Sequence, residues 1–191
     1  MNRKTALKSI VVFVTLGVSS GALYEFLKPG DTVPVTSLPK KKELIAELAE
    51  TIIPRTDTPG ANDAKVEDYI IKMIIENTDA KTQKSFMAGL SSLEHYTVEN
   101  YHQQFVQCSA SQKTEILKHF ENKGTYSIGL LNKVSKKLLG PSFFYKLKDL
   151  TVEGYCTSFA GATKGLAYDF IPVNFEACIP LKKNQPAWAT K

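Results

Sequence analysis

The sequence predicts a mainly α-helical protein. We expect a compact bundle of about five to six helices, with an irregular C-terminal strap and an N-terminal signal or anchor helix. Three observations predict this class. Apolar residues recur at helical spacing through most of the chain, proline and glycine interrupt that spacing at intervals, and a basic leader precedes an apolar run at the N-terminus. At 191 residues, the chain is long enough for one well-packed core.

The charge of the chain argues against a nucleic-acid partner. Its formal net charge is +5, but Arg3, Lys4 and Lys8 all precede the first acidic residue, Glu25. Without these three cations the remaining chain carries +2. Its lysines are scattered apart from Lys40–Lys42, so no continuous basic surface is predicted.

Residues 1–24 are predicted to be an export signal or signal anchor. Basic residues 1–8 precede the uncharged stretch Ser9–Tyr24, which is shorter than the roughly 20 residues that span a membrane as a helix. The small residues Ser20, Gly21 and Ala22 have the spacing that a signal peptidase accepts, so cleavage after Ala22 is plausible. The start resembles a twin-arginine export signal, carried by Arg3, Lys4, Leu7 and Lys8, with lysine in place of the second arginine. Twin-arginine export, general secretion and an uncleaved membrane anchor are the alternatives, and each places the protein in the periplasm or cell envelope.

The domain that follows is expected to begin after a linker. Residues 25–40 contain proline and glycine with little periodicity, which predicts an extended linker. Residues 41–191 are predicted to form a single helical domain. Its first helix is Lys41–Ile53, where apolar residues form a wide stripe, and Pro54 ends it.

A loop rich in turn-forming residues comes next. Its Asp and Asn oxygens suggest a calcium site, but their spacing lacks the alternating acids and the closing Glu of a calcium loop. We therefore expect turn and capping chemistry, with Asn62 or Asp63 capping a helix over Ala64–Glu76.

Thr78 or Asp79 is expected to cap a long helix that reaches about Gln107. A set of His and Glu side chains shares one face of this helix at spacings of four and seven residues. They lie among polar residues without a zinc-type signature, so we expect solvated side chains and no metal. The set is His95, Glu99 and His102, and Glu94 lies next to His95 in the sequence.

Two further helical segments precede the last part of the chain. Ser109 begins an S-x-x-Q capping box for a helix around Ser111–Asn122. An amphipathic segment covers Tyr126–Leu139. The inward-facing residues of these and the following segment are predicted to be Ile116, Leu117, Phe120, Phe143, Phe144, Leu147 and Leu150.

Lys148–Pro180 is predicted to organise the packing of the domain. Gly154, Gly161 and Gly165 are interspersed with aromatic residues, a composition that lets backbones approach closely while rings fill the remaining space. Beyond Gly161 the helical periodicity weakens into an irregular strap, for which Trp188 is the expected anchor.

Three cysteines leave two thiol arrangements open. Cys156 and Cys178 lie in the same segment and are the candidate disulfide, which leaves Cys108 unpaired. The alternative is three buried free thiols.

The sequence contains no motif for a cofactor or a catalytic nucleophile. G-x-G-x-x-G, which holds the pyrophosphate of flavin and nicotinamide cofactors, does not occur. C-x-x-C-H for covalent haem and G-x-S-x-G for a nucleophile elbow do not occur either. We therefore expect no catalytic residue and no cofactor in this chain.

Three blocks of sequence resemble the gluconate 2-dehydrogenase subunit 3 family. Glu47–Ile70 contains an I-P-x-T-D-T-P-G-A core, and Leu150–Pro172 contains a G-Y-x-T-S-x-x-G-A-T pattern. The third block is Cys178–Ala189, and the resemblance runs from about Glu43 to Ala189.

This resemblance implies a non-catalytic small subunit of a dehydrogenase complex. In the family, a large subunit of the glucose-methanol-choline (GMC) type holds FAD and oxidises an alcohol or aldose, and a cytochrome c subunit often accepts the electrons. The small subunit carries the export signal, and membrane association comes from its N-terminus or from a partner. The alternative is a free-standing helical binding or structural protein of the cell envelope. The residues expected at the partner interface are Asp57, Pro59, Gly60, Tyr155, Phe159, Gly161 and Tyr168.

Overall fold

The computed structural model describes residues 34–123 and 142–168, and from the C-terminal part residues 171, 178, 180, 181 and 183–189. The predicted export-signal residues Arg3, Lys4, Leu7 and Lys8 lie outside the described residues, and so does Tyr126–Leu139. Nothing in the structure therefore tests the predictions for those two segments.

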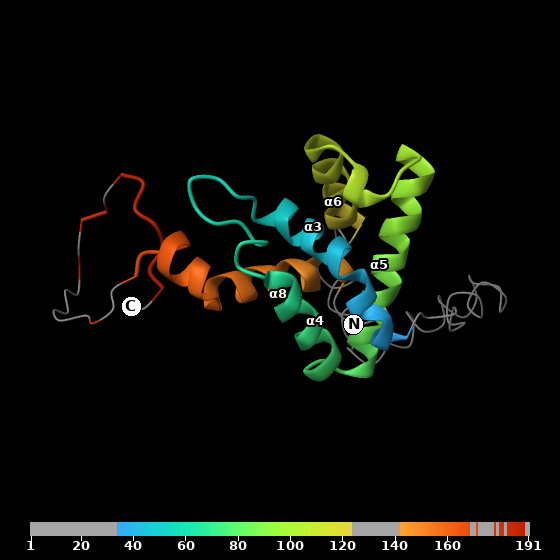
Figure 1. Ribbon diagram of the computed structural model, residues 1–191, viewed down its shortest axis with the longest axis horizontal. Coiled ribbons are helices and arrows are strands. Elements are labelled where there is room, and N and C mark those ends of the chain that lie inside the picture. The colour runs from blue at the N-terminus through green and yellow to red at the C-terminus, as the bar shows by residue number, and fades with distance from the viewer. Residues whose placement is uncertain are drawn as a thin grey trace, which may run out of the picture. The chain divides into compact units, whose positions relative to one another are not determined.

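Helices account for the regular structure of the described residues (Figure 1), which confirms the predicted fold class. No strand is named among these residues, where a single isolated bridge is the one β-type pairing. The α-helices are α3 (Lys42–Ile52), α4 (Val66–Glu76), α5 (Ala80–Tyr101), α6 (Ala110–Lys123) and α8 (Phe143–Thr157). The shorter elements are the 3-10 helices η1 (Val35–Lys41) and η2 (Phe105–Gln107) and the π-helical turn η3 (Gly161–Gly165).

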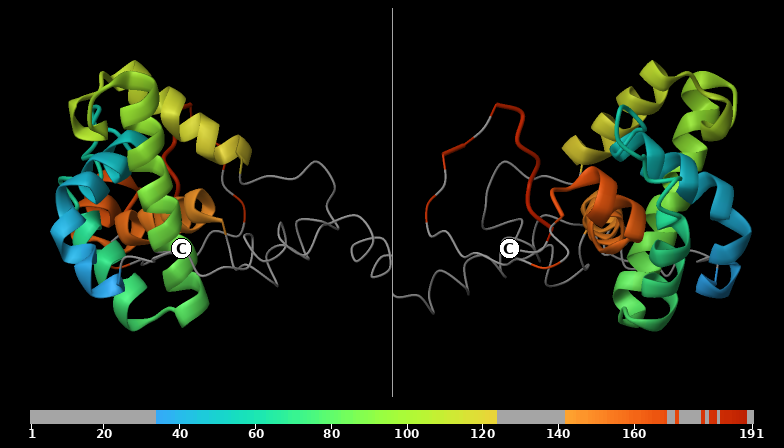
Figure 2. Two further views of the ribbon diagram at one scale, coloured as in Figure 1. Left: turned by 90° about the vertical axis from the view of Figure 1, so that its right-hand side faces the viewer. Right: turned by 60° about the vertical axis from the view of Figure 1, so that its left-hand side comes forward.

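Helix α8 occupies the centre of this arrangement, because it contacts α3, α4, α5 and α6 as well as η3. In the right-hand view of Figure 2, α8 is seen almost end-on with the other helices beside it. The predicted inward residues Phe143, Phe144, Leu147 and Leu150 are all buried. The predicted inward face of α8 is therefore confirmed, but Phe143, Phe144 and Leu147 precede the predicted organising segment Lys148–Pro180. Within that segment, the buried residues of α8 are Leu150, Thr151, Gly154 and Tyr155.

The core consists of apolar side chains from all five α-helices and from η1 and η2, together with Ala61 and Cys108 from the connecting loops. Aromatic rings join α5, α6 and α8: the centroids of Phe86 and Phe143 lie 5.2 Å apart, and those of Phe120 and Phe143 lie 6.2 Å apart. Burying each such large apolar side chain contributes about 1.5–3 kcal/mol, so this contact region supplies much of the stability.

Two predicted helix caps are confirmed. The Asp79 side chain accepts a hydrogen bond from the Thr82 backbone N–H at 3.2 Å at the start of α5. At the start of α6, the Gln112 side chain accepts from the Ser109 N–H at 2.8 Å. The Ser109 hydroxyl accepts from the Gln112 N–H at 3.3 Å, which completes the capping box.

Helix α5 ends earlier than the sequence predicted. It stops at Tyr101 because His102 adopts a left-handed conformation, with φ of 54°, and the chain turns there. Phe105, expected in the same helix, lies in η2 and is still buried. The apolar spacing continued past the end of the helix because η2 faces the same core.

The start of the folded region also differs from the prediction. Residues 35–41, most of which were assigned to an extended linker, form η1 and place Leu38 in the core with no exposed surface. Helix η1 contacts α3, α4 and α5. Proline at position 39 is compatible with a 3-10 turn, so the proline-rich composition concealed a packed element.

The C-terminal strap is fastened by its backbone. Ala167 donates to the Ala187 carbonyl and accepts from the Ala189 N–H, each at 2.8 Å, forming a parallel bridge with Trp188. The Trp188 residue, the predicted anchor, lies at this bridge and remains 37% exposed. None of the helices in the described part of the chain combines the length and the apolar character that a membrane span requires.

Candidate partner-binding site at the end of α8

The loop between α3 and α4 is closed by the Glu50 carboxylate. Its Oε1 accepts from the Arg55 backbone N–H and its Oε2 from the Asn62 N–H, both at 2.8 Å. A Cβ on Gly60 would overlap this carboxylate, so the glycine allows the loop to close around Glu50. The sequence analysis missed Glu50. A negative charge in the last turn of a helix is electrostatically unfavourable. The position of Glu50 in the last turn of α3 could therefore have indicated that its carboxylate binds groups outside the helix.

A second carboxylate, that of Asp63, holds the same loop from its far end. Asp63 Oδ2 accepts from the Gly60 N–H at 3.0 Å, and Oδ1 accepts from Arg55 Nη1 at 3.2 Å. The predicted helix cap by Asn62 or Asp63 is therefore wrong. Helix α4 begins at Val66, after Lys65 in a left-handed conformation with φ of 53°, because Asp63 binds the loop.

Tyr155 joins this loop to the end of α8. Its hydroxyl donates to the Pro59 carbonyl at 2.7 Å, across 96 positions of sequence, and the residue is only 7% exposed. Its own carbonyl accepts from the Ser158 hydroxyl at 2.7 Å and from the Ser158 N–H at 3.1 Å. The two sequence blocks centred on the loop and on the end of α8 are therefore in direct contact.

Glycines on α8 and η3 make that contact close. A Cβ on Gly161 would overlap the Tyr155 carbonyl oxygen, and a Cβ on Gly165 would overlap the Tyr155 hydroxyl. Within α8, a Cβ on Gly154 would lie 2.7 Å from the Tyr69 ring of α4. The prediction that these glycines permit close approach is confirmed.

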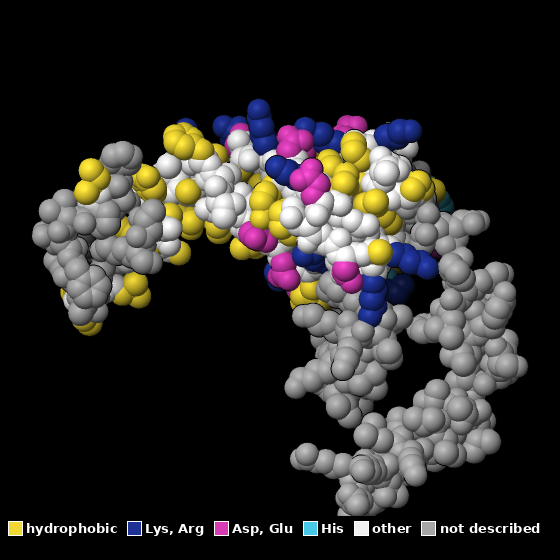
Figure 3. All heavy atoms as spheres, turned by 90° about the horizontal axis from the view of Figure 1, so that it is seen from below, with side chains coloured by type: hydrophobic (Ala, Val, Ile, Leu, Met, Phe, Trp, Pro, Cys, Tyr) yellow, Lys and Arg dark blue, Asp and Glu magenta, His cyan; other side chains and the backbone are white. Residues whose placement is uncertain are grey.

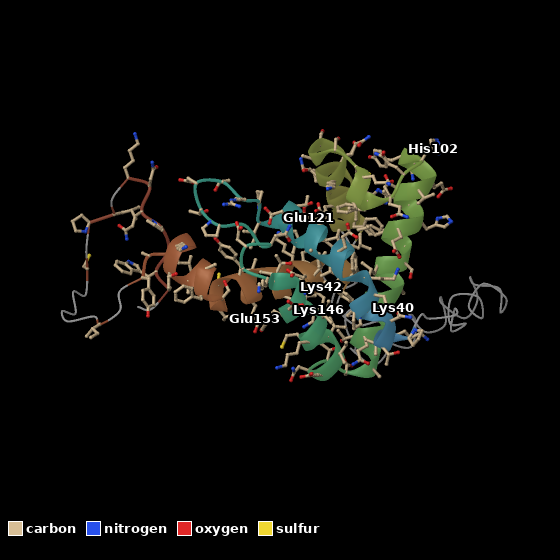
Figure 4. All side chains as sticks on the ribbon, in the orientation of Figure 1. Lys40, Lys42, His102, Glu121, Lys146 and Glu153 are labelled. Carbon is tan, nitrogen blue, oxygen red and sulfur yellow. The ribbon has the colours of Figure 1, made fainter. Side chains whose placement is uncertain are left out.

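Helices α4 and α8 also meet through Tyr69 and Glu153, the latter labelled on α8 in Figure 4. Partial burial raises the pKa of the Tyr69 hydroxyl, and the neighbouring Glu153 carboxylate raises it further. The neutral tyrosine is thus the form that this contact favours.

The residues predicted at the partner interface separate into two groups. Gly60, Tyr155 and Gly161 are buried within the chain, where they hold the loop and η3, and Pro59 is half-buried. Asp57 is exposed, Phe159 is 81% exposed and Tyr168 is 43% exposed. Only this second group is available to a partner.

Other large apolar side chains are exposed in the same part of the chain. Ile171 is 65% exposed and Leu181 is 86% exposed. Figure 3 shows hydrophobic side chains gathered around this C-terminal part, at left, whereas charged side chains lie mainly over the helices. Several exposed large apolar side chains in one part of a chain are typical of a protein contact.

The other predicted sites are distributed as follows. Cys108 is buried, Cys156 is half-buried and Cys178 is exposed, and the pairing of Cys156 with Cys178 stays a prediction. His95 Nδ1 lies 3.5 Å from a Glu99 carboxylate oxygen, but His102 leaves the helix at its left-handed turn. Among the described residues, no group of three His, Cys, Asp or Glu side chains is arranged to hold a metal ion.

One small hollow lies between α3, α6 and α8 and is lined in part by Thr51, Leu117 and Phe144. Glu121 and Lys148, also in its lining, are paired at 3.4 Å. The two charges therefore form an ion pair that joins α6 to α8.

Comparison with protein families agrees with this geometry. Residues 39–173 match the model of the family described as Gluconate 2-dehydrogenase subunit 3. The match contains both blocks that meet at Tyr155 and Pro59, and it ends before the third block, Cys178–Ala189. No curated protein and no solved structure matches the chain. The chain therefore belongs to the gluconate 2-dehydrogenase subunit 3 family and, as that membership implies, is a subunit of such a dehydrogenase complex.

Proposed function

We propose that this chain is the non-catalytic small subunit of a periplasmic, FAD-dependent sugar or alcohol dehydrogenase. In this proposal it binds and stabilises a flavoprotein subunit of the GMC type and supplies the export signal of the complex through residues 1–24. FAD, and haem c where a cytochrome subunit is present, belong to the partners.

The observation that carries the proposal is how the family's two main sequence blocks use their polar groups. Both oxygens of Glu50, both oxygens of Asp63 and the Tyr155 hydroxyl bind groups of this same chain. A general acid, base or nucleophile has to reach a substrate atom instead. These residues therefore favour a role in building a surface over a role in a reaction.

The exposed side chains beside that framework favour a protein partner. Phe159 and Tyr168 are exposed aromatic groups, and aromatic side chains are enriched at the centres of protein interfaces. An isolated soluble protein gains nothing from exposing them, whereas a permanent subunit buries them on assembly.

Export of the complex is the second part of the proposal. A flavoprotein that folds around FAD and has no signal of its own crosses the membrane only together with a partner that has one. The leader with Arg3, Lys4, Leu7 and Lys8 supports that role for this chain.

Inspection of the neighbouring reading frames for a GMC-type flavoprotein without a signal, followed by co-expression of the two chains, tests the proposal. We expect the two chains to co-purify, flavin absorbance to follow the partner, and this chain alone to lack flavin, haem absorbance and dehydrogenase activity. Stoichiometric flavin on this chain alone would contradict the proposal. Failure of any flavoprotein to co-purify would favour a free-standing envelope protein.

The export route has its own test in Arg3→Lys. If the twin-arginine route operates, we expect the change to abolish export of both this chain and the flavoprotein. Unchanged export of both chains would indicate the general secretory route. Lys28→Arg, which also keeps the charge but lies outside residues 1–24, is the matched control.

A further inference from the structure

We propose that Tyr155 is a positioning residue that holds two separate segments as one partner-binding surface. The first segment is the Arg55–Asp63 loop and the second is the Ser158–Gly165 turn. This inference rests on the proposed function, because it assigns the surface that the flavoprotein subunit contacts.

The contacts of Tyr155 reach both segments from one side chain and its backbone. The hydroxyl donates to Pro59 in the middle of the loop. The Tyr155 carbonyl accepts from Ser158, whose hydroxyl in turn accepts from the Gly161 N–H at 2.9 Å. The Tyr155 ring and hydroxyl also lie directly against Gly165 at the end of the turn.

Without this residue, the two segments have separate supports. The loop retains Glu50 and Asp63, which close it on α3 and on itself. The turn retains its own backbone hydrogen bonds, such as Ala162 N–H to the Ser158 carbonyl at 2.9 Å and Leu166 N–H to the Gly161 carbonyl at 2.9 Å. The hydrogen bond from the Tyr155 hydroxyl to the Pro59 carbonyl therefore fixes the position of the loop relative to the turn.

The surface held in this way fits a protein and not a lipid bilayer. Between Gly154 and Tyr168 the only charged residue is Lys164, whereas binding to anionic lipid requires clustered cations. Phe159 and Tyr168 project from this weakly charged segment, and Asp57 is exposed on the loop. Uncharged aromatic anchors beside a polar loop match the core and rim of a subunit interface, so we assign the flavoprotein subunit as the occupant.

Tyr155→Phe tests the inference because it deletes only the hydroxyl. We expect amide hydrogen exchange to become about threefold to tenfold faster in both segments, as for the loss of one partly buried hydrogen bond. We expect binding of the full-length variant to the flavoprotein to weaken by a similar factor. Tyr145→Phe is the matched control, since it deletes the same atom from an exposed tyrosine on the same helix, and it should change neither quantity.

Gly165→Ala provides a second variant that acts on the same joint without changing Tyr155. Its Cβ would displace the Tyr155 hydroxyl, so it should reproduce the faster exchange in the Arg55–Asp63 loop, which is remote in sequence. Faster exchange in only one segment, or unchanged affinity despite faster exchange in both, would overturn the inference. If the wild-type chain binds no flavoprotein, the proposed function and the assigned occupant both fail, and exchange alone then decides whether Tyr155 couples the segments.

Discussion

The two ends of the α8 region are built in different ways. From Phe143 to Leu150 the helix buries apolar side chains among α3, α5 and α6, and its contacts are large and non-directional. From Gly154 to Tyr168 the chain relies on glycine clearances and on single hydrogen bonds to Tyr155, and it leaves aromatic side chains exposed. The first end supplies stability, and the second end defines a shape. Substitutions at the first end should therefore lower mainly the free energy of unfolding, and substitutions at the second end should lower mainly the affinity for the partner.

The largest expected effect is at the buried end. Leu147 has no exposed surface, so Leu147→Ala should lower the free energy of unfolding by about 2–5 kcal/mol through lost burial and a cavity. Chemical denaturation measures this loss. The affinity of the remaining folded molecules for the flavoprotein should be unchanged, and a large loss of affinity would show that the two ends are not separate.

Gly161→Val should have the next largest effect, because the added side chain overlaps the Tyr155 carbonyl at the shape-defining end. We expect a loss of about 1–3 kcal/mol in the free energy of unfolding together with loss of the complex. Ala162→Val, at the next and half-buried position, is the control. Equal behaviour of the two variants in denaturation and co-purification would remove the special role of Gly161.

Phe159→Ala should separate binding from stability. Phe159 is 81% exposed, so the free energy of unfolding should change by less than about 0.5 kcal/mol. Affinity for the flavoprotein should fall by about tenfold or more, as for an aromatic interface anchor. Val98→Ala, at a 51% exposed position on α5, is the comparison, and similar affinities for both variants would contradict the assigned surface.

The smallest effect concerns pH at the contact between α4 and α8. Because the folded state raises the Tyr69 pKa, the stability that this hydroxyl contributes is fully present below the unfolded-state pKa of about 10. That contribution is lost as the pH rises through the folded-state value. Urea denaturation at about pH 8 and about pH 11 should therefore show a smaller loss in the free energy of unfolding at the higher pH for Tyr69→Phe than for the wild type. An identical loss would show that Tyr69 does not report on this contact.

Much of the fold followed from apolar periodicity. The lengths of α3 and α6, the caps at Asp79 and Ser109, and the inward face of α8 were all predictable because local spacing and burial agree there. The C-terminal end of α5 and the start of α4 were not. Each depends on one non-glycine residue, His102 or Lys65, in a left-handed conformation. Amino-acid composition does not predict that conformation for His or Lys.

The sequence predicted which segments form the site, but it did not predict which residues of those segments are buried and which are exposed. Sequence motifs identified the loop and the end of α8, but they did not distinguish buried supports such as Tyr155 from exposed groups such as Phe159. That distinction depends on the long-range contact between Tyr155 and Pro59. Glu50 was missed for the same reason, since its partners lie in the loop beyond the helix that carries it.

The bridge between Ala167 and Trp188 bears on where a working fragment of this protein can be cut. The family match, residues 39–173, excludes Leu38 at one end and Ala187–Ala189 at the other. A fragment with those bounds would open a hole in the core beneath η1 and would leave the backbone N–H and C=O of Ala167 without the partners they have here. Fragments intended for binding or crystallisation should therefore begin before Val35 and extend through Ala189, with any affinity tag placed beyond the bridge.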